Sequence, residues 1–221
     1  MGSWIELEAD DGHKLDAYRA RPHAPVRGGL VVVQEVFGVN DHIRRVCDGF
    51  AADGYDVAAP ALFDRIEKKV ELGYGADELA AGRGYRTRLA WDDVVRDVKA
   101  ATRAVTETGR VGVVGYCWGG SVAWLAATRL DVACAVGYYG GQIIQFKDEK
   151  PRCPVMLHFG EKDSLIPAAD VAAIRAAQPE VTVHLYPAGH GFNCDRRKDF
   201  DPASADAGRR RTLAFFAEHL G

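Results

Sequence analysis

Hydrophobic and polar positions follow two alternating patterns along this chain, and together they predict a sheet covered by helices. Residues 4–8 and 14–18 alternate apolar and polar side chains on either side of the Asp-Gly pair at positions 11 and 12, which predicts an antiparallel hairpin. Residues 30–33 read Leu-Val-Val-Val, and a continuous, mostly β-branched run is typical of a parallel strand buried on both faces. The chain therefore begins with a hairpin and continues into a buried sheet.

Strands and helices are expected to alternate from there to the C-terminus. Further strands are predicted over residues 55–59, 111–115, 132–138, 155–159 and 181–186, and helices over residues 41–53, 76–90, 91–107, 119–129, 168–177 and 204–219. This order predicts an α/β fold with a mostly parallel central sheet, helices on both faces and an antiparallel N-terminal hairpin. No internal repeat or linker interrupts it, so a single domain over residues 1–221 is expected.

The charge balance and the apolar runs exclude several classes of partner. The 221 residues carry 28 Lys and Arg against 31 Asp and Glu, a formal net charge of −3 at pH 7. A balance so near zero gives no general attraction to nucleic acid or anionic lipid, and the basic runs 196–198 and 209–211 are too short for a nucleic-acid face. No apolar run approaches the roughly 20 residues of a membrane-spanning helix. The N-terminus lacks the basic start and apolar stretch of a signal peptide, so a cytoplasmic protein is expected.

Cysteine and histidine spacing gives no sign of a metal or a cofactor. The five cysteines include no Cys-x-x-Cys pair, and in a reducing compartment each is expected to be a free thiol. The histidines form no His-x-His or His-Glu-x-x-His pattern, and no glycine-rich phosphate motif is present. We therefore expect neither a metal site nor a cofactor.

One cysteine lies in a glycine-rich turn between a predicted strand and a predicted helix. Residues 115–120 read Gly-Tyr-Cys-Trp-Gly-Gly, the thiol form of the nucleophile elbow. Such a turn exposes the side chain of Cys117 above the sheet, and the N-terminus of the next helix favours a thiolate and an oxyanion. The alternative interpretation is that Cys117 only fills space in a tight turn.

Two further candidate residues follow later strands. Asp163 comes after the strand predicted at 155–159, and His190 lies in a Gly-His-Gly loop after residues 181–186. Ligands of open α/β sheets bind beyond the carboxyl ends of the strands, so these side chains are expected to converge on Cys117. Each alone could be an ordinary turn or surface residue, but the order Cys, Asp, His is that of the α/β-hydrolase triad.

The triad residue types predict acyl chemistry. His190 would accept the thiol proton, Asp163 would orient the imidazole, and Cys117 would attack an acyl carbonyl to give a thioester that water then hydrolyses. The backbone N–H groups of Trp118 and Val36 are expected to bind the oxyanion. An aromatic substrate pocket is expected, with core packing as the alternative role of its members, which are Phe37, Tyr85, Tyr139 and Phe192.

Four strings of residues resemble the dienelactone hydrolases, or carboxymethylenebutenolidases, and the resemblance extends over nearly the whole chain. They are QEVFGVN at 34–40, GYCWGG at 115–120, GEKD at 160–163 and GHGF at 189–192. The resemblance implies an α/β-hydrolase fold, a monomer, a triad of Cys117, His190 and Asp163, and hydrolysis of a small ester or lactone. It also implies that Glu35 contacts the resting thiol and modulates it; a buried carboxylate is costly unless it is paired.

The chain departs from this family pattern at both positions of the substrate-binding arginines, and it has Gly191 where the family has serine. Typical members hold the substrate carboxylate with one arginine four residues before a tyrosine and another four residues after the catalytic histidine, and here these positions hold Ala81 and Cys194. Arg83, Arg196 and Arg197 are the candidates to replace them. The departures leave the substrate open. They also leave two alternative functions: a thioesterase or acyltransferase on the same fold, or a reactive-thiol sensor or binding protein without turnover.

Overall fold

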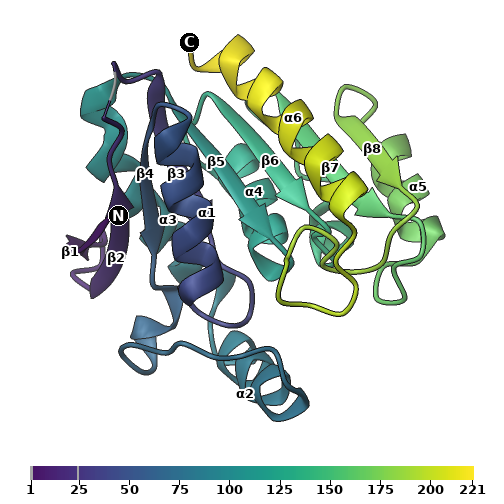
Figure 1. Cartoon of the computed structure of the whole chain (residues 1–221), viewed down its shortest axis with the longest axis horizontal. Helices are drawn as coiled ribbons and strands as arrows, with labels where there is room; N and C mark the ends of the chain where they lie inside the picture. Colours follow the sequence, from purple (N-terminus) through teal and green to yellow (C-terminus); the bar gives the residue numbers. More distant parts are fainter. Residues whose placement is uncertain (1, 24) are drawn as a thin grey trace.

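The structure, a computed structural model, describes residues 2–23 and 25–221, and its centre is one eight-stranded sheet (Figure 1). The strand order is β1-β2-β4-β3-β5-β6-β7-β8. β3 to β8 are parallel to their neighbours, whereas β1 pairs antiparallel with β2, and β2 pairs antiparallel with β4. The predicted α/β fold with an antiparallel N-terminal hairpin is confirmed.

The elements follow the predicted order. The strands are β1 (Ser3–Glu8), β2 (Lys14–Ala20), β3 (Gly28–Val33), β4 (Tyr55–Pro60), β5 (Val111–Tyr116), β6 (Cys134–Tyr138), β7 (Val155–Gly160) and β8 (Thr182–Tyr186). The α-helices are α1 (Asp41–Ala52), α2 (Ala76–Thr87), α3 (Trp91–Val105), α4 (Trp118–Arg129), α5 (Ala168–Ala177) and α6 (Pro202–His219). Short 3-10 turns occur at η1 (Leu62–Arg65), η2 (Thr106–Thr108) and η3 (Ile143–Phe146).

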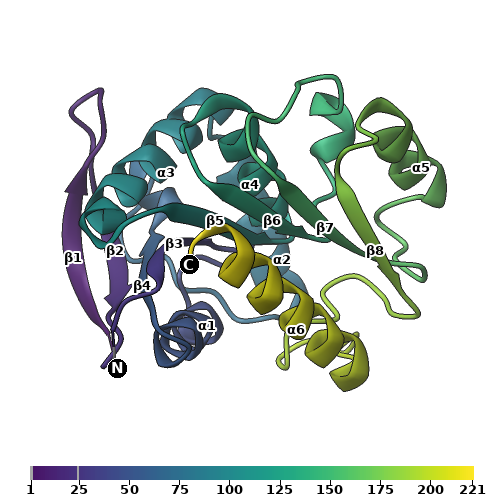
Figure 2. The same cartoon turned by 90° about the horizontal axis from the view of Figure 1, so that it is seen from above.

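Helices cover both faces of the sheet. Figure 2 shows α1 and α6 on one face, and α3 and α4 on the other. α2 lies apart from these layers, beyond one end of the strands (Figure 1). The sheet therefore has two apolar interfaces, and its strand ends are left for loops and α2.

Two-sided coverage explains why the middle strands read as apolar runs. Every residue of β3, β4, β5, β6 and β7 is buried. By contrast, α3 buries one stripe that includes Val94, Val98, Ala101 and Val105, the helical spacing expected of a helix that packs on a sheet. None of the helices within the described residues has the length and apolar character required to cross a membrane.

The boundary between α2 and α3 differs from the prediction. α2 ends at Thr87 rather than at residue 90, because Ala90 has an extended backbone (φ −76°, ψ 140°) and precedes the first turn of α3. A turn between the two helices needs non-helical residues that a pattern of side chains does not reveal. The segment at 61–75, expected to be a loop, includes the single 3-10 turn η1.

Candidate active site

The turn that carries Cys117 has a strained backbone. Cys117 adopts φ 54° and ψ −120°, in the left-handed half of backbone space that non-glycine residues rarely occupy. Its N–H donates to the carbonyl of Tyr138 (3.0 Å), and its own carbonyl accepts from the N–H of Gly120 (2.9 Å). These two bonds hold the side chain of Cys117 between the end of β5 and the start of α4, and such strain is characteristic of functional turns.

The glycines around Cys117 are required by close backbone contacts. A Cβ on Gly115 would lie 1.9 Å from the carbonyl oxygen of Gly119, and a Cβ on Gly119 would lie 2.5 Å from the carbonyl oxygen of Val33. Both separations are far below van der Waals contact. The motif at 115–120 therefore allows α4 to begin directly against the end of the sheet.

His190 bridges Cys117 and Asp163. The Nε2 atom of His190 lies 3.2 Å from the Sγ atom of Cys117, and its Nδ1 atom lies 2.7 Å from Oδ2 of Asp163. The Asp163 carboxylate is fully buried, and its other oxygen accepts a hydrogen bond from the N–H of Leu165 (2.8 Å). Three segments that are far apart in the chain thus meet in the order expected from the sequence.

Opposing effects set the charge of His190. Burial by itself lowers its pKa, but the charge of Cys117, the hydrogen bonds of the imidazole to Asp163 and Cys117, and the charge of Asp163 outweigh burial and raise the pKa from 6.5 to about 10. The ring of Tyr139 packs edge-on against the imidazole, with 5.2 Å between ring centroids. The site therefore favours an imidazolium held between a sulfur and a carboxylate.

A cavity of about 140 Å³ opens above the sulfur, and three arginines line it. Arg83 and Arg86 come from α2, whereas Arg197 comes from the loop between β8 and α6. The other lining residues are Val36, Leu79, Cys117, Trp118, Gly141, Gln142, Leu165 and His190. Val36 and Trp118, the two predicted oxyanion donors, are thus both at the cavity wall.

The arginine candidates separate into two groups. Arg83 and Arg197 line the cavity as suggested, but Arg196 lies at the surface and pairs with Asp41 (3.4 Å) and Asp195. Arg86, which also lines the cavity, was not among the arginines suggested by the sequence. Its separation of three residues from Arg83 on a predicted helix would have indicated a shared face.

The four predicted pocket aromatics do not line this cavity but lie behind its wall. Tyr139 packs on His190, and Phe192 packs on Tyr139 with ring centroids 5.3 Å apart. Phe37 lies beneath the guanidinium of Arg197, 5.9 Å from its carbon to the ring centroid. Tyr85 stacks on Phe63, and its hydroxyl donates to Glu67. Phe37, Tyr139 and Phe192 are buried, whereas Tyr85 lies half-buried on α2, and contact of all four with substrate stays a prediction.

Glu35 is fully buried and is paired on both oxygens. Oε1 accepts from Nη1 of Arg197 (3.3 Å), and Oε2 accepts from the hydroxyl of Tyr74 (3.2 Å). Within the described part of the chain, the hydrogen bond of the Cys117 side chain goes to His190 and not to Glu35. The carboxylate is paired with an arginine and a tyrosine, and its modulation of the thiol stays a prediction.

Several known proteins are similar in sequence to this chain. The sequence model of the dienelactone hydrolase family matches residues 15–220. A provisionally named carboxymethylenebutenolidase of Azospirillum brasilense is 34% identical, covering 98% of this chain and 99% of its own length. Carboxymethylenebutenolidase 1 of Cupriavidus pinatubonensis is 27% identical, covering 98% of this chain and 97% of its own.

Solved structures show the same fold. A provisionally named dienelactone hydrolase of Klebsiella pneumoniae superposes with a TM-score of 0.86 at 28% identity and covers 99% of both chains. An esterase of Pyrococcus furiosus superposes with a TM-score of 0.73 at 15% identity, over all of this chain and 93% of its own. At that identity the second likeness concerns the fold alone.

Proposed function

This chain belongs to the dienelactone hydrolase family, whose members hydrolyse esters or lactones, and from this premise we propose that it cleaves a small ester or lactone bearing an anionic group. The proposed chemistry passes through a thioester on Cys117. The single observation that carries it is the bridge of His190 between the Cys117 sulfur (3.2 Å) and the Asp163 carboxylate (2.7 Å). Both distances are within the reach that proton transfer needs.

The proposed reaction has two halves. His190 takes the proton of Cys117, and the thiolate attacks the acyl carbon to give a tetrahedral oxyanion. The imidazolium returns this proton to the leaving alkoxide as the C–O bond breaks and the thioester remains. A water molecule then attacks the thioester with His190 as base, which releases the acid and restores the thiol. Asp163 keeps the imidazole in the required tautomer throughout.

The oxyanion is proposed to bind two backbone N–H groups. Trp118 is the first residue of α4, and the first N–H groups of a helix have no partner within it. Val36 follows β3 and also lines the cavity. Glu35 is proposed to modulate the thiol through Arg197, because the charges of both Glu35 and Cys117 raise the pKa of that arginine.

The arginines support an anionic substrate. Neither Arg83 nor Arg86 takes part in an ion pair among the residues described by the structure, whereas Arg197 is paired with Glu35. Two unpaired guanidinium groups at one cavity wall favour a carboxylate or a similar anion. They occupy other positions than Ala81 and Cys194, so the anion is proposed to enter by a different route from that of typical family members.

A pair of matched substrates tests this proposal. We expect an aryl ester that carries a carboxylate to be hydrolysed with sustained turnover, and the Cys117→Ala variant to hydrolyse neither it nor its neutral analogue. The double variant Arg83→Gln/Arg86→Gln is expected to lose roughly 10-fold or more in kcat/KM for the anionic ester, and less than about 3-fold for the neutral one, as for loss of charge-assisted bonds.

Arg88→Gln is the matched control, because Arg88 is an exposed residue just beyond α2 and is not among the lining residues. Equal losses on both esters would reject the anion site. A single stoichiometric burst without further turnover would identify a reactive-thiol protein instead of a hydrolase, and transfer of the acyl group to an added alcohol would identify an acyltransferase.

A further inference from the structure

A second cluster of reactive side chains lies next to Glu35. It contains Glu35, which follows β3, His42 in the first turn of α1, and Cys194 in the loop between β8 and α6. One ligand atom of each residue lies within 4.8 Å of those of the other two. All three residues are buried. From this geometry we propose that Glu35, His42 and Cys194 bind a divalent cation of the zinc type.

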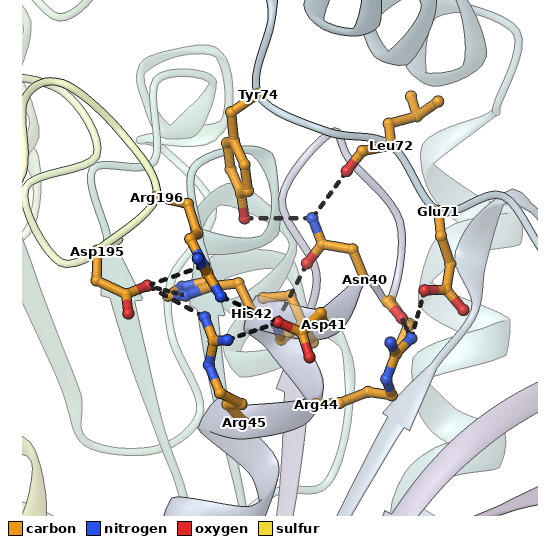
Figure 3. Close-up of polar contacts among 12 residues, drawn as sticks. Asn40, Asp41, His42, Arg44, Arg45, Glu71, Leu72, Tyr74, Asp195 and Arg196 are labelled. Carbon is orange, nitrogen blue, oxygen red and sulfur yellow. Dashed lines mark hydrogen bonds and ion pairs between the residues drawn. The ribbon is translucent and has the colours of Figure 1, made fainter.

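The imidazole of His42 supplies the strongest evidence. Its Nδ1 atom lies 3.1 Å from Oδ1 of Asp195, while its Nε2 atom is buried and has no hydrogen-bond partner among the described residues (Figure 3). A carboxylate only accepts hydrogen bonds, so Nδ1 carries the hydrogen and Nε2 presents a lone pair. A carboxylate that orients a histidine in this way is the usual support of a metal ligand. An unused buried nitrogen otherwise costs stability.

Cys194 contributes the soft ligand. Its side chain is fully buried, so the thiol is shielded from solvent. Burial, and next the charge of Glu35, raise its pKa to about 12, so the sulfur holds its proton before a cation binds. On binding, the S–H bond breaks, the sulfur–metal bond forms, and the proton leaves to water.

Glu35 keeps the capacity to bind a cation although both of its oxygens are paired. Each carboxylate oxygen has two acceptor positions, and Arg197 and Tyr74 each use one. A thiolate and a carboxylate together carry two negative charges, the charge needed to balance a divalent cation, while the positive charge of Arg197 on Glu35 and the negative charge of Asp195 on His42 offset each other. Thiolate, imidazole and carboxylate are zinc ligands, whereas Mg²⁺ and Ca²⁺ prefer sites made of oxygen alone.

The distances require only a small contraction. Tetrahedral zinc with bonds of about 2.0–2.3 Å places its ligands roughly 3.3–3.8 Å apart, so the three atoms, which lie within 4.8 Å of one another, would close in by at most about 1.0–1.5 Å. Three protein ligands leave a fourth position for water. The path of a cation from solvent to this cluster is short, because His42 and Asp195 also line a surface pocket of about 220 Å³ together with Asn193.

The test uses the Cys117→Ala protein as its parent, so that the thiol of the active site cannot bind metal. Co²⁺ is titrated into the metal-free protein and followed by absorption, and Zn²⁺ is then added in competition. We expect one equivalent of Co²⁺ to bind with a thiolate-to-cobalt band, Zn²⁺ to displace it, and Zn²⁺ to raise the melting temperature, as for any ligand of the native state.

Two substitutions in this parent assign the site. Cys194→Ser should abolish the thiolate band and weaken Zn²⁺ binding by at least about 10-fold, whereas Asp195→Asn should keep the band and weaken Zn²⁺ binding by roughly 10–100-fold. Cys153→Ser is the matched control, because Cys153 precedes β7 in a different part of the fold. This variant should leave the thiolate band and the Zn²⁺ affinity unchanged.

Other outcomes would overturn the proposal. Absence of stoichiometric Co²⁺ binding, or binding without a thiolate band, would mean that the cluster is a hydrogen-bonded network only. Unchanged affinity in Cys194→Ser would place the metal elsewhere. If Cys194→Ser does not fold, the Asp195→Asn variant tests the site instead, because Asp195 is half exposed and its replacement does not disturb the core. An unchanged Zn²⁺ affinity of Asp195→Asn would then reject the site.

Discussion

At the scale of single residues, one imidazole determines the electrostatics of the candidate active site. His190 contacts a sulfur on one nitrogen and a buried carboxylate on the other, and its ring is packed against Tyr139. The sequence indicated these partners only through their order along the chain. The raised pKa of His190 then makes a prediction about stability that does not depend on substrate.

Stability should depend on pH through His190. Its folded-state pKa, about 10, lies above the unfolded value of 6.5, so its contribution is fully present below about pH 6.5 and is lost as the pH rises towards 10. We expect the difference in unfolding free energy between the wild-type protein and His190→Gln to shrink over this window, by on the order of 1.4 kcal/mol for each unit of pKa shift. Urea unfolding at several pH values measures it.

A constant difference across that pH range would contradict the proposed imidazolium. The same variant also tests the proposed role of His190 as the base, because replacing a residue of a catalytic triad typically costs about 10³-fold or more in rate. A loss below tenfold in ester hydrolysis would remove His190 from the catalytic machinery even if its effect on stability were confirmed.

At the scale of elements, the connection from β5 to α4 sets the position of the Cys117 thiol. The strained backbone of Cys117 is tolerated because strand and helix backbones approach closely at Gly115 and Gly119. Any side chain there would separate α4 from the end of β3. Stability and the position of the thiol therefore depend on the same glycines.

We predict that Gly119→Ala destabilises the protein by several kcal/mol, on the order of 3, because its Cβ would lie 2.4 Å from the carbonyl oxygen of Gln34 and 2.5 Å from that of Val33. The matched control is Gly84→Ala. Gly84 is inside α2 with no atom within 4 Å of an added Cβ, so that change should stabilise by about 0.5–1 kcal/mol. Chemical denaturation compares the two; equal effects would refute the role of close approach.

At the scale of the whole molecule, one buried ion-pair network ties the N-terminal hairpin to the sheet layers. Arg65 in η1 donates two hydrogen bonds to Asp97 of α3, each 2.7 Å, and another to Asp11 in the β1–β2 turn at 2.8 Å. The Asp97 carboxylate is fully buried, and burial raises its pKa despite Arg65. Three distant segments thus depend on one guanidinium.

We predict that Arg65→Ala costs about 3–5 kcal/mol of unfolding free energy, because it leaves the Asp97 charge buried and unpaired. Arg103→Ala is the control: Arg103 is half exposed and pairs with Asp10 at the surface, so its loss should cost less than about 1 kcal/mol. Thermal and urea unfolding measure the loss of unfolding free energy in each of these two variants. Similar small costs for both variants would mean that Asp97 is satisfied by other groups.

Much of the fold followed from local patterns. Runs such as residues 30–33 predicted two-sided burial, and the helix at 168–177 has the predicted bounds. These features were accessible because each depends on neighbours in the chain. The ends of the elements were harder to predict from the sequence, because a turn depends on the backbone angles of a few residues. The end of α2 at Thr87 is an example.

The sequence by itself determined the α/β fold, the glycine-rich turn at Cys117 and the order of Cys117, Asp163 and His190, because strand ends gather wherever parallel strands are assembled. Only the tertiary structure decided which side chains meet across that edge: Arg197 and Tyr74 on Glu35, and Cys194 beside His42. These contacts join residues up to 162 positions apart. No local pattern encodes them, since they depend on how loops and helices pack around the sheet.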